Sequence, residues 1–205
     1  MHFEVLNAQQ QKILPRLGVF KKQYYLVGGT AIALQIGHRF SIDFDLFSLK
    51  PINHSRLTGK LIQQDIQYIL LFKNAEGLHL LSEGVKITFF EYPFSIPHRI
   101  EVDGHLTMPA LLDLAAMKAY ALGRRSKWKD YVDLYFLLRD HFSFHEISAA
   151  AEKLFGGAFS KKLFKTQLGY FDDVDYSEQV DYLPGFHVAD ENIKAFLSDL
   201  SFESF

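Results

Sequence analysis

The chain has 205 residues, with 22 Lys or Arg against 24 Asp or Glu, and its formal net charge is −2 at pH 7. This balance excludes a strongly basic nucleic-acid-binding coat but does not exclude a local basic patch. The absence of cysteine excludes disulfide bonds, thiolate zinc sites and a cysteine nucleophile. We see neither a signal pattern at the N-terminus nor an apolar run long enough to cross a membrane, so we expect a soluble, cytoplasmic protein.

The N-terminal third predicts a helix, a strand and a second helix in turn. Residues 2–17 carry apolar side chains at helical spacing, with Pro15 as an interruption or an end. Residues 24–27 form an apolar, aromatic run that suits a buried strand, and Gly28-Gly29 then turns the chain. Good helix formers follow from Thr30 to Ile36.

The next apolar run, residues 42–47, carries Asp43 and Asp45. Side chains two apart on a strand point to the same face, so both carboxylates project from one spot. Two adjacent carboxylates repel each other unless a cation lies between them. Mg²⁺ is the natural candidate, because it binds a few carboxylate oxygens and leaves its other positions for water and substrate phosphates.

The Gly28-Gly29 turn before this strand predicts a phosphate cradle. Its backbone N–H groups are unobstructed by Cβ atoms and lie at a helix N-terminus, with the Thr30 hydroxyl beside them. The alternative is an ordinary turn, followed by an edge strand that presents Asp43 and Asp45 to solvent.

Further strands and one helix follow before residue 108. Asn53 is a predicted N-cap for a helix that runs to about residue 64. We expect a buried strand at 66–72, a short strand at 78–81, a strand with alternating apolar and polar residues at 85–92, and a last edge strand at 100–106. Helices interleaved early and antiparallel pairs later predict an α/β (α+β) fold with a mixed sheet, and we expect residues 1–108 to form the core lobe.

Residues 109–205 are predicted to form a helical lobe. Pro109 suits a first helical position, and an acidic, turn-rich surface loop is expected at 172–181. The predicted helices cover residues 111–122, 129–139, 144–155 (stopped by Gly156-Gly157), 160–168 and 191–200.

The first two of these helices carry a second group of charged residues. Lys118 and Arg125 are seven apart and share a face if the first helix extends that far. Asp130 and Asp133 are three apart on the next helix and also share a face. By themselves these charges fit an ion-pair network that ties two helices together.

The order GGT, GHR and then SxDxD resembles the DNA polymerase β-like nucleotidyltransferase superfamily, and GGTAIALQIGHRFSIDFDLF is similar to the opening motif of its AbiEii/AbiGii-type toxin branch. The similarity continues through Lys118, Arg125 and the Lys-Asp-x-x-Asp-Leu block at 129–134, so it covers residues 24–138. It implies a nucleotidyltransferase fold followed by a helical lobe.

The resemblance also implies roles for the matching residues. Asp43 and Asp45 would hold Mg²⁺ and Lys118 the triphosphate, while Asp133 would orient Lys118 or position the attacking hydroxyl. Residues expected to contact the nucleotide are Gly28, Gly29, Thr30, Arg39, Ser41, Arg125, Lys129 and Asp130. Arg39 is either a phosphate contact or a salt-bridge partner, and Ser41 can hydrogen-bond near the metal pair.

One departure from the superfamily concerns its third carboxylate, which usually lies on a neighbouring strand. The strand predicted at 85–92 has Lys86 and Thr88 inside it and only Glu91 at its end. Either Glu91 or Asp133 substitutes, or the site is weaker than the polymerase-like form, which leaves the general base and two-metal chemistry open.

The resemblance implies Mg²⁺-dependent transfer of NMP from an NTP to an acceptor, with the 3′ end of a tRNA as the expected acceptor. It further implies a bacterial toxin with a cognate antitoxin protein as its partner. The alternatives are a catalytically weak binding or regulatory module and an enzyme that nucleotidylates a protein side chain. The dense basic patch, formed by Arg124, Arg125, Lys127 and Lys129 around Trp128, contacts an RNA backbone or is a solvated turn.

Overall fold

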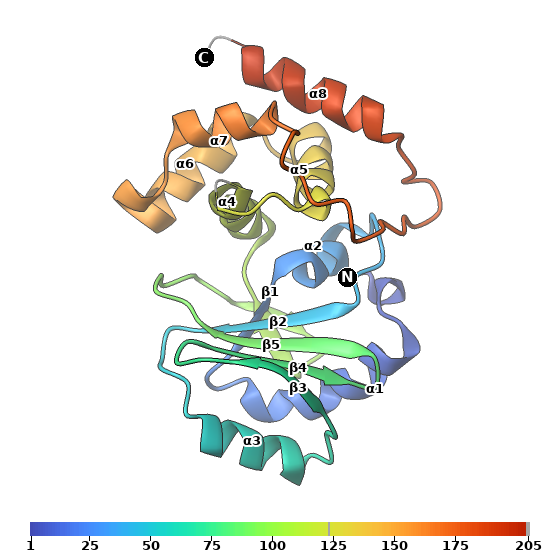
Figure 1. Ribbon diagram of the computed structural model, residues 1–205, viewed down its shortest axis with the longest axis vertical. Helices are drawn as coiled ribbons and strands as arrows, with labels where there is room; N and C mark the ends of the chain where they lie inside the picture. The colour runs from blue at the N-terminus through green and yellow to red at the C-terminus, as the bar shows by residue number, and fades with distance from the viewer. Residues whose placement is uncertain (123, 204–205) are drawn as a thin grey trace. The chain divides into compact units, whose positions relative to one another are not determined.

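The structure is a computed structural model that describes residues 1–122 and 124–203. The chain divides into two compact units, Met1–Ala110 and Leu111–Phe205. Figure 1 shows strands and helices in unit 1 and helices in unit 2. No helix in the described ranges is both long and apolar enough to cross a membrane.

The first five strands of unit 1 form a sheet in the order β1-β2-β5-β4-β3. Their bounds are β1 Tyr25–Val27, β2 Asp43–Ser48, β3 Ile69–Lys73, β4 Gly77–Ser82 and β5 Val85–Glu91. The central neighbours β2 and β5 are parallel, and every other neighbouring pair is antiparallel. The mixed α/β sheet predicted from the sequence is therefore confirmed.

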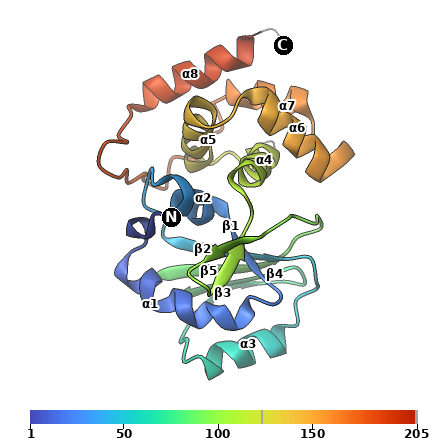
Figure 2. The ribbon, with the colours of Figure 1, turned by 180° about the vertical axis from the view of Figure 1, so that it is seen from behind.

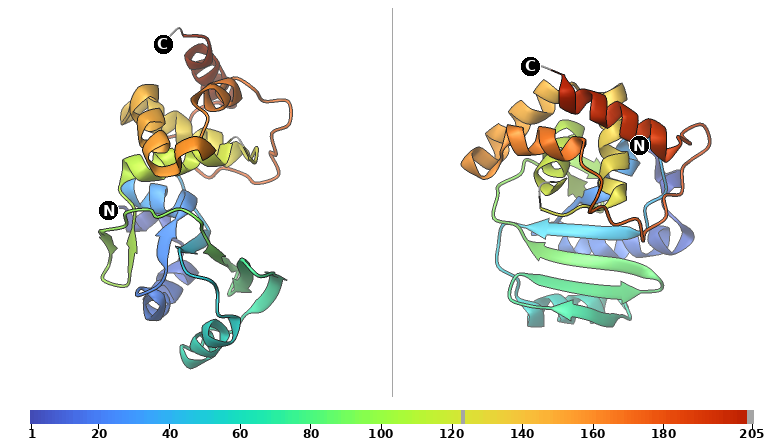
Figure 3. Two further views of the ribbon diagram at one scale, coloured as in Figure 1. Left: turned by 90° about the vertical axis from the view of Figure 1, so that its left-hand side faces the viewer. Right: turned by 45° about the horizontal axis from the view of Figure 1, so that its top comes forward.

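One face of this sheet forms the core of unit 1. Phe44 and Leu46 of β2 and Ile87 and Phe89 of β5 are fully buried there, and Phe20 packs on Phe89 with 4.9 Å between ring centroids. Figure 2 shows α1 in front of the sheet on the side from which that view is taken. On the opposite face, seen obliquely in the right panel of Figure 3, β2, β5 and β4 run side by side. The β2 side chains on this face are half-buried, whereas Thr88 of β5 is buried.

The helices of unit 1 are α1 Ala8–Leu17, α2 Gly28–Ile36 and α3 His54–Gln63, with short 3₁₀ turns at Phe3–Val5 (η1) and Gly18–Phe20 (η2). Pro15 neither interrupts nor ends α1, because it lies in the last turn and the helix continues to Leu17. Asn53 caps α3 as predicted, since its side chain accepts a hydrogen bond from the backbone N–H of Arg56 at 2.9 Å.

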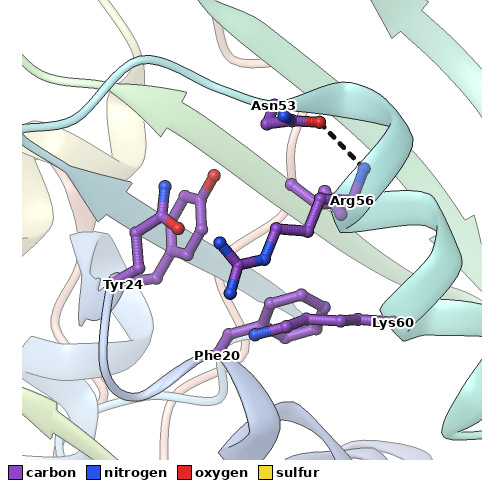
Figure 4. Close-up of a pocket in the computed structure, with 7 residues that line it drawn as sticks. Phe20, Tyr24, Asn53, Arg56 and Lys60 are labelled. Carbon is purple, nitrogen blue, oxygen red and sulfur yellow. Dashed lines mark hydrogen bonds between the residues drawn. The ribbon is translucent and has the colours of Figure 1, made fainter.

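A small pocket lies between η2 and α3. Figure 4 shows Arg56 between Tyr24 and Phe20, with Lys60 beside the Phe20 ring. Because Phe20 packs on the core-facing Phe89, this pocket belongs to the side of the sheet opposite Asp43 and Asp45.

Strand β3 corrects one prediction, because it is not buried. Its apolar residues from Ile69 to Phe72 are each at least half exposed, whereas Ile66, before the strand, is buried. The strand pairs only with β4 and stands at the edge of the sheet. An apolar run does not show, from sequence alone, whether a second strand will pair with its other edge.

The predicted single edge strand at 100–106 is also wrong. The chain instead forms a separate two-stranded hairpin, β6 Ile100–Val102 with β7 Leu106–Met108. Asp103 and Gly104 both have positive φ, 50° and 70°, which is the requirement of a tight hairpin turn. The Asp-Gly dipeptide was the available signal.

Unit 2 contains α4 Leu111–Leu122, α5 Trp128–Asp140, α6 Phe144–Phe155, α7 Lys161–Leu168 and α8 Asp190–Phe202, with a 3₁₀ turn η3 at Gly156–Ala158. One prediction detail is wrong, because Pro109 precedes the first helical residue by two positions. Helix α4 has the predicted bounds and ends at Leu122, so the condition under which Lys118 and Arg125 would share its face is not met. Ser143 begins α6 with a capping box that includes Glu146.

The segment 172–181 contains no helix or extended strand among its described residues, as expected for a loop. It is nevertheless attached to the start of α5, because Asp175 forms a β-bridge with Lys127. Behind this attachment, Tyr131 and Phe136 of α5 are among the largest fully buried side chains.

Candidate active site

Strand β2 presents Asp43 and Asp45 on one face, as their spacing predicts. Burial alternates along the strand, so that Asp43, Asp45 and Phe47 are half-buried while Phe44 and Leu46 are enclosed in the core. The core residues anchor β2 in the middle of the sheet, between β1 and β5. Two carboxylates are therefore held in fixed positions on a face that solvent can reach.

The Gly-Gly turn lies directly against Asp45. Helix α2 begins at Gly28, which has φ +74°, and a Cβ atom at this residue would overlap the Asp45 carboxylate. A Cβ atom at Gly29 would overlap the guanidinium of Arg39. The two glycines thus permit a close approach between the N-terminus of α2, a carboxylate and a buried cation.

Thr30 and Ser41 connect α2 to the beginning of β2. The Thr30 hydroxyl is hydrogen-bonded to the Ser41 hydroxyl at 2.8 Å and donates to the backbone carbonyl of Asp43. Both side chains are buried. These hydroxyls fix the backbone that carries Asp43. The sequence predicts a phosphate contact for Thr30 and does not predict this structural role.

Arg39 and His38 are buried beside this connection, at 2% and 0% exposure. Arg39 donates from Nη1 to the backbone carbonyl of Phe40 at 3.0 Å, while its Nη2 lies against Gly29. Gly37, which adopts φ +68°, caps the C-terminus of α2, and the buried His38 follows it.

The position expected for a third carboxylate carries other side chains. Register on the parallel neighbour β5 places Lys86 beside Asp43 and Thr88 beside Asp45. Glu91 pairs with Ser48 and shares the face of the core residues, so it does not join the two aspartates. Burial raises the pKa of Tyr24 to about 12, with a contribution from the Glu91 charge, which agrees with this position of Glu91 on the core side.

The donor set of Asp43 and Asp45 fits one Mg²⁺ ion. Within the described residues no cluster of three or more His, Asp or Glu side chains could hold a metal. Mg²⁺ does not require such a cluster, since it is commonly bound by one or two carboxylates and completes its octahedron with water and substrate phosphates. Lys86 on the same face adds a positive charge where a third acid would have added a negative one.

In unit 2, Lys118 forms the centre of a buried charged cluster. Its ammonium contacts Asp130 Oδ1 and lies 2.8 Å from Asp133 Oδ2, and the three side chains are at most 6% exposed. Arg125 binds the other side of Asp130, with 2.9 Å between Nε and Oδ2. Asp130 and Asp133 share a face of α5 as predicted, whereas Lys118 and Arg125 meet on Asp130 and not along one helix.

Electrostatics inside this cluster favour its charged form. Burial alone would raise the pKa of Asp130, but Lys118 and Arg125 outweigh burial and hold that pKa below its ordinary value. The cluster has two cations and two anions, but the Arg125 side chain is 53% exposed, so Lys118 is the buried cation that Asp130 and Asp133 share. Asp133 contacts the Lys118 ammonium, and its two predicted roles stay predictions.

The cations of the basic patch are engaged within unit 2. The Arg124 guanidinium lies 3.6 Å from the centre of the Tyr120 ring and donates to the carbonyl of Ala158. Lys127 and Lys129 both bind Glu178 from the acidic loop. This compensation favours the interpretation of a structural, surface-paired turn over an RNA-binding patch.

Comparison with known proteins agrees with these features. The model of the AbiEii nucleotidyl transferase toxin family of type IV toxin–antitoxin systems matches residues 12–103 and 81–204. An uncharacterised protein from Aquifex aeolicus is 30% identical over 197 residues, which are 92% of this chain and 94% of that protein.

Two solved structures have a similar fold. MenT4, a nucleotidyltransferase toxin from Mycobacterium tuberculosis, superposes with a TM-score of 0.58 and 13% identity, covering 95% of this chain and 81% of its own. JHP933 from Helicobacter pylori gives a TM-score of 0.57 and 16% identity, covering 96% and 91%. The chain therefore belongs to the AbiEii toxin family and is a nucleotidyltransferase of the toxin–antitoxin type.

Proposed function

We propose that this enzyme uses Mg²⁺ to transfer a nucleoside monophosphate from an NTP to the 3′ hydroxyl of an RNA, with a tRNA end as the acceptor that the family resemblance implies. The observation that carries the proposal is the pair Asp43 and Asp45, fixed on one half-buried face with the N-terminus of α2 against Asp45. Repulsion between the two carboxylates is relieved by a divalent cation, and the helix N-terminus favours a phosphate beside it.

Bound Mg²⁺ would neutralise charge on the triphosphate and on the pyrophosphate that leaves. The remaining work falls to the chain. Gly28 and Gly29 leave room for Asp45 and Arg39 against the N-terminus of α2, and Thr30 holds the backbone of Asp43 in place. Arg39 places a buried positive charge behind Gly29, where it supports anion binding at the turn.

Lys118 and Asp133 remain predicted catalytic residues on the strength of the resemblance. An ammonium has three N–H donors, and Asp130 and Asp133 accept from two directions. The two carboxylates hold Lys118 in one orientation, which is the preorganisation that a phosphate-binding lysine requires. Arg125, Lys129 and Asp130 would act through this cluster or through its surroundings.

The family also implies an antitoxin partner. We propose that this partner is a protein, the cognate antitoxin of the toxin–antitoxin pair. The proposed substrates, NTP and RNA, are cytoplasmic, and we propose the same location for the enzyme.

The proposal is tested by incubating the purified chain with each α-³²P-labelled NTP, MgCl₂ and either total RNA or RNA-free protein extract. We expect label on RNA from one preferred NTP, loss of labelling with EDTA, and no labelling by the Asp43→Asn/Asp45→Asn variant. Label on protein alone would replace RNA by a protein acceptor, and labelling by the double variant at the wild-type rate would place the active site elsewhere.

A further inference from the structure

The edge strand β3 contains a bulge that changes which face its side chains occupy. Ile69 pairs with Leu81 and Leu70 with Leu80, but the next pair is Phe72 with His79, so that Leu71 is an extra residue. In a regular strand, Leu71 would follow Ile69 onto the same face. The bulge gives that place to Phe72 instead, and bulges commonly redirect a side chain beside an active site.

The face that Phe72 reaches is the face of Asp45. His79 pairs with Thr88, and Thr88 pairs with Asp45, so Asp45, Thr88, His79 and Phe72 form one row across β2, β5, β4 and β3. Neighbouring strands are about 4.8 Å apart, which puts the backbones of His79 and Phe72 about 10 and 14 Å from that of Asp45. A nucleotide lying over Thr88 would direct its sugar towards Asp45 and its base towards Phe72.

The side chains at the far end of this row have the chemistry of a base-binding site. Phe72 is 51% exposed, and its ring packs against His79 edge to face, with centroids 5.3 Å apart. Burial and the nearby Lys86 charge lower the pKa of His79, and they outweigh the opposing effect of Asp45. A neutral imidazole and a phenyl ring stack on nucleobases, while Lys86 on the same face suits a backbone phosphate.

We propose that Phe72 and His79 form the acceptor subsite, in which the base of the acceptor's 3′-terminal nucleotide stacks on Phe72 beside His79. This inference rests on the proposed RNA acceptor, and it specifies where the acceptor binds relative to Asp43 and Asp45. The occupant covers one face of β3 only, the face that is continuous with Asp45.

The opposite face of the same strand supplies a matched control. Leu70 has the same 51% exposure as Phe72, but it pairs with the core-facing Leu80. A protein strand added to the edge of β3, including a second copy of this chain, would cover both faces and make both residues important. A stacked base makes only Phe72 important.

The experiment measures fluorescence anisotropy of a 5′-labelled short single-stranded oligoribonucleotide with the full chain, in MgCl₂, for intact RNA and for RNA with an abasic 3′-terminal residue. We expect Phe72→Ala to weaken binding of intact RNA about 10-fold, the scale for one lost stacking contact. Binding of abasic RNA should change little. Leu70→Ala should affect neither RNA, and Phe72→Trp should preserve the preference for intact RNA.

The subsite is overturned if Phe72→Ala and Leu70→Ala weaken binding equally, or if Phe72→Ala weakens abasic and intact RNA to the same extent. The labelling assay separates this failure from failure of the proposed function. Wild-type protein that labels no RNA overturns the proposed function. RNA labelled by Phe72→Ala with the wild-type KM for RNA overturns the subsite alone. Circular dichroism of each variant checks folding, which half-exposed positions on an edge strand should not disturb.

Discussion

The two charged groups of this enzyme are built in opposite ways. In unit 2, Lys118 and Arg125 face Asp130 and Asp133 in one cluster of opposite charges, with Arg125 half exposed and the other three buried. In unit 1, Asp43 and Asp45 stand on one half-buried face of β2, with Thr88 beside Asp45 where a third acid would lie.

The difference lies in exposure and in the sign of the charges: unit 2 pairs buried opposite charges, and unit 1 places two like charges on a half-buried face. Charges removed from water are tolerated when each has a partner, and the buried cluster meets that condition within the chain. Two like charges on one face repel each other, and a bound cation relieves that repulsion; Asp43 and Asp45 share one half-buried face of β2. Loss of a charge should therefore affect stability in unit 2 and chemistry in unit 1.

The largest expected effect comes from Asp43→Asn/Asp45→Asn. We expect transfer to fall by at least about 10³-fold, because both predicted metal ligands are lost. The free energy of unfolding should stay unchanged or rise, because a repulsion is removed. Radiolabel transfer and urea unfolding measure the two quantities, and Mn²⁺ binding followed by electron paramagnetic resonance supplies a readout independent of activity. A destabilised variant that still binds Mn²⁺ would show that the two aspartates stabilise the fold and do not bind the metal.

Lys118→Met is the opposite case. It leaves Asp133 and one side of Asp130 without their cation in a buried site, so we expect a loss of about 3–5 kcal/mol in the free energy of unfolding. Transfer, measured below the variant's melting temperature, should fall by about 10²-fold if Lys118 also binds phosphate. Adding Asp133→Asn should recover part of the stability. A variant as stable as wild type would show that the cluster contributes little.

Acid should weaken the same cluster in a defined direction. The pKa of Asp130 is lower in the folded chain than in the unfolded chain, so its ionisation stabilises the fold above about pH 4 and this contribution is lost as the pH falls through the folded pKa. Urea unfolding of wild type and Asp130→Asn should show a large difference at pH 7 that shrinks towards pH 3. A difference that is independent of pH would exclude the charge of Asp130 as its cause.

A smaller effect is expected for Gly28→Ala. The residue has φ +74°, which costs an L-residue about 1–2 kcal/mol, and the new methyl group must displace the Asp45 carboxylate. We expect that loss of stability together with weaker Mn²⁺ binding. Gly84→Ala is a suitable control, since Gly84 also has positive φ, +80°, but nothing lies within 4 Å of its Cβ position. Equal Mn²⁺ affinity in both variants would show that Gly28 does not support Asp45.

The sequence predicted the parts of this contrast that depend on local spacing. A two-residue period places Asp43 and Asp45 on one face, and a three-residue step places Asp130 and Asp133 together. It could not predict contacts between elements, such as Thr30 with the carbonyl of Asp43, because register between strand and helix is fixed by packing of the whole unit.

The same limit explains the errors. An apolar run such as residues 69–72 indicates a strand, but its exposure depends on whether a second neighbour pairs with it. The position of Thr88 beside Asp45, and that of Glu91 on the other face, follow from the pairing of β2 with β5. His79 lies in one row with Asp45 because β4 pairs with β5 and β5 pairs with β2. No local sequence pattern could have predicted that position.

The smallest expected effect concerns the basic patch, whose charges are paired at the surface and not buried. Lys127 binds Glu178, but both side chains are more than a third exposed, so water and salt screen the pair. Lys127→Ala should therefore change the free energy of unfolding by at most about 1 kcal/mol, and 1 M salt, which shortens the Debye length to about 3 Å, should reduce even that. Transfer to RNA should stay within about twofold of wild type if Glu178 already compensates this lysine. A tenfold rise in the KM for RNA would show that the patch contacts the acceptor, because a pair that only stabilises a turn has no effect on RNA binding.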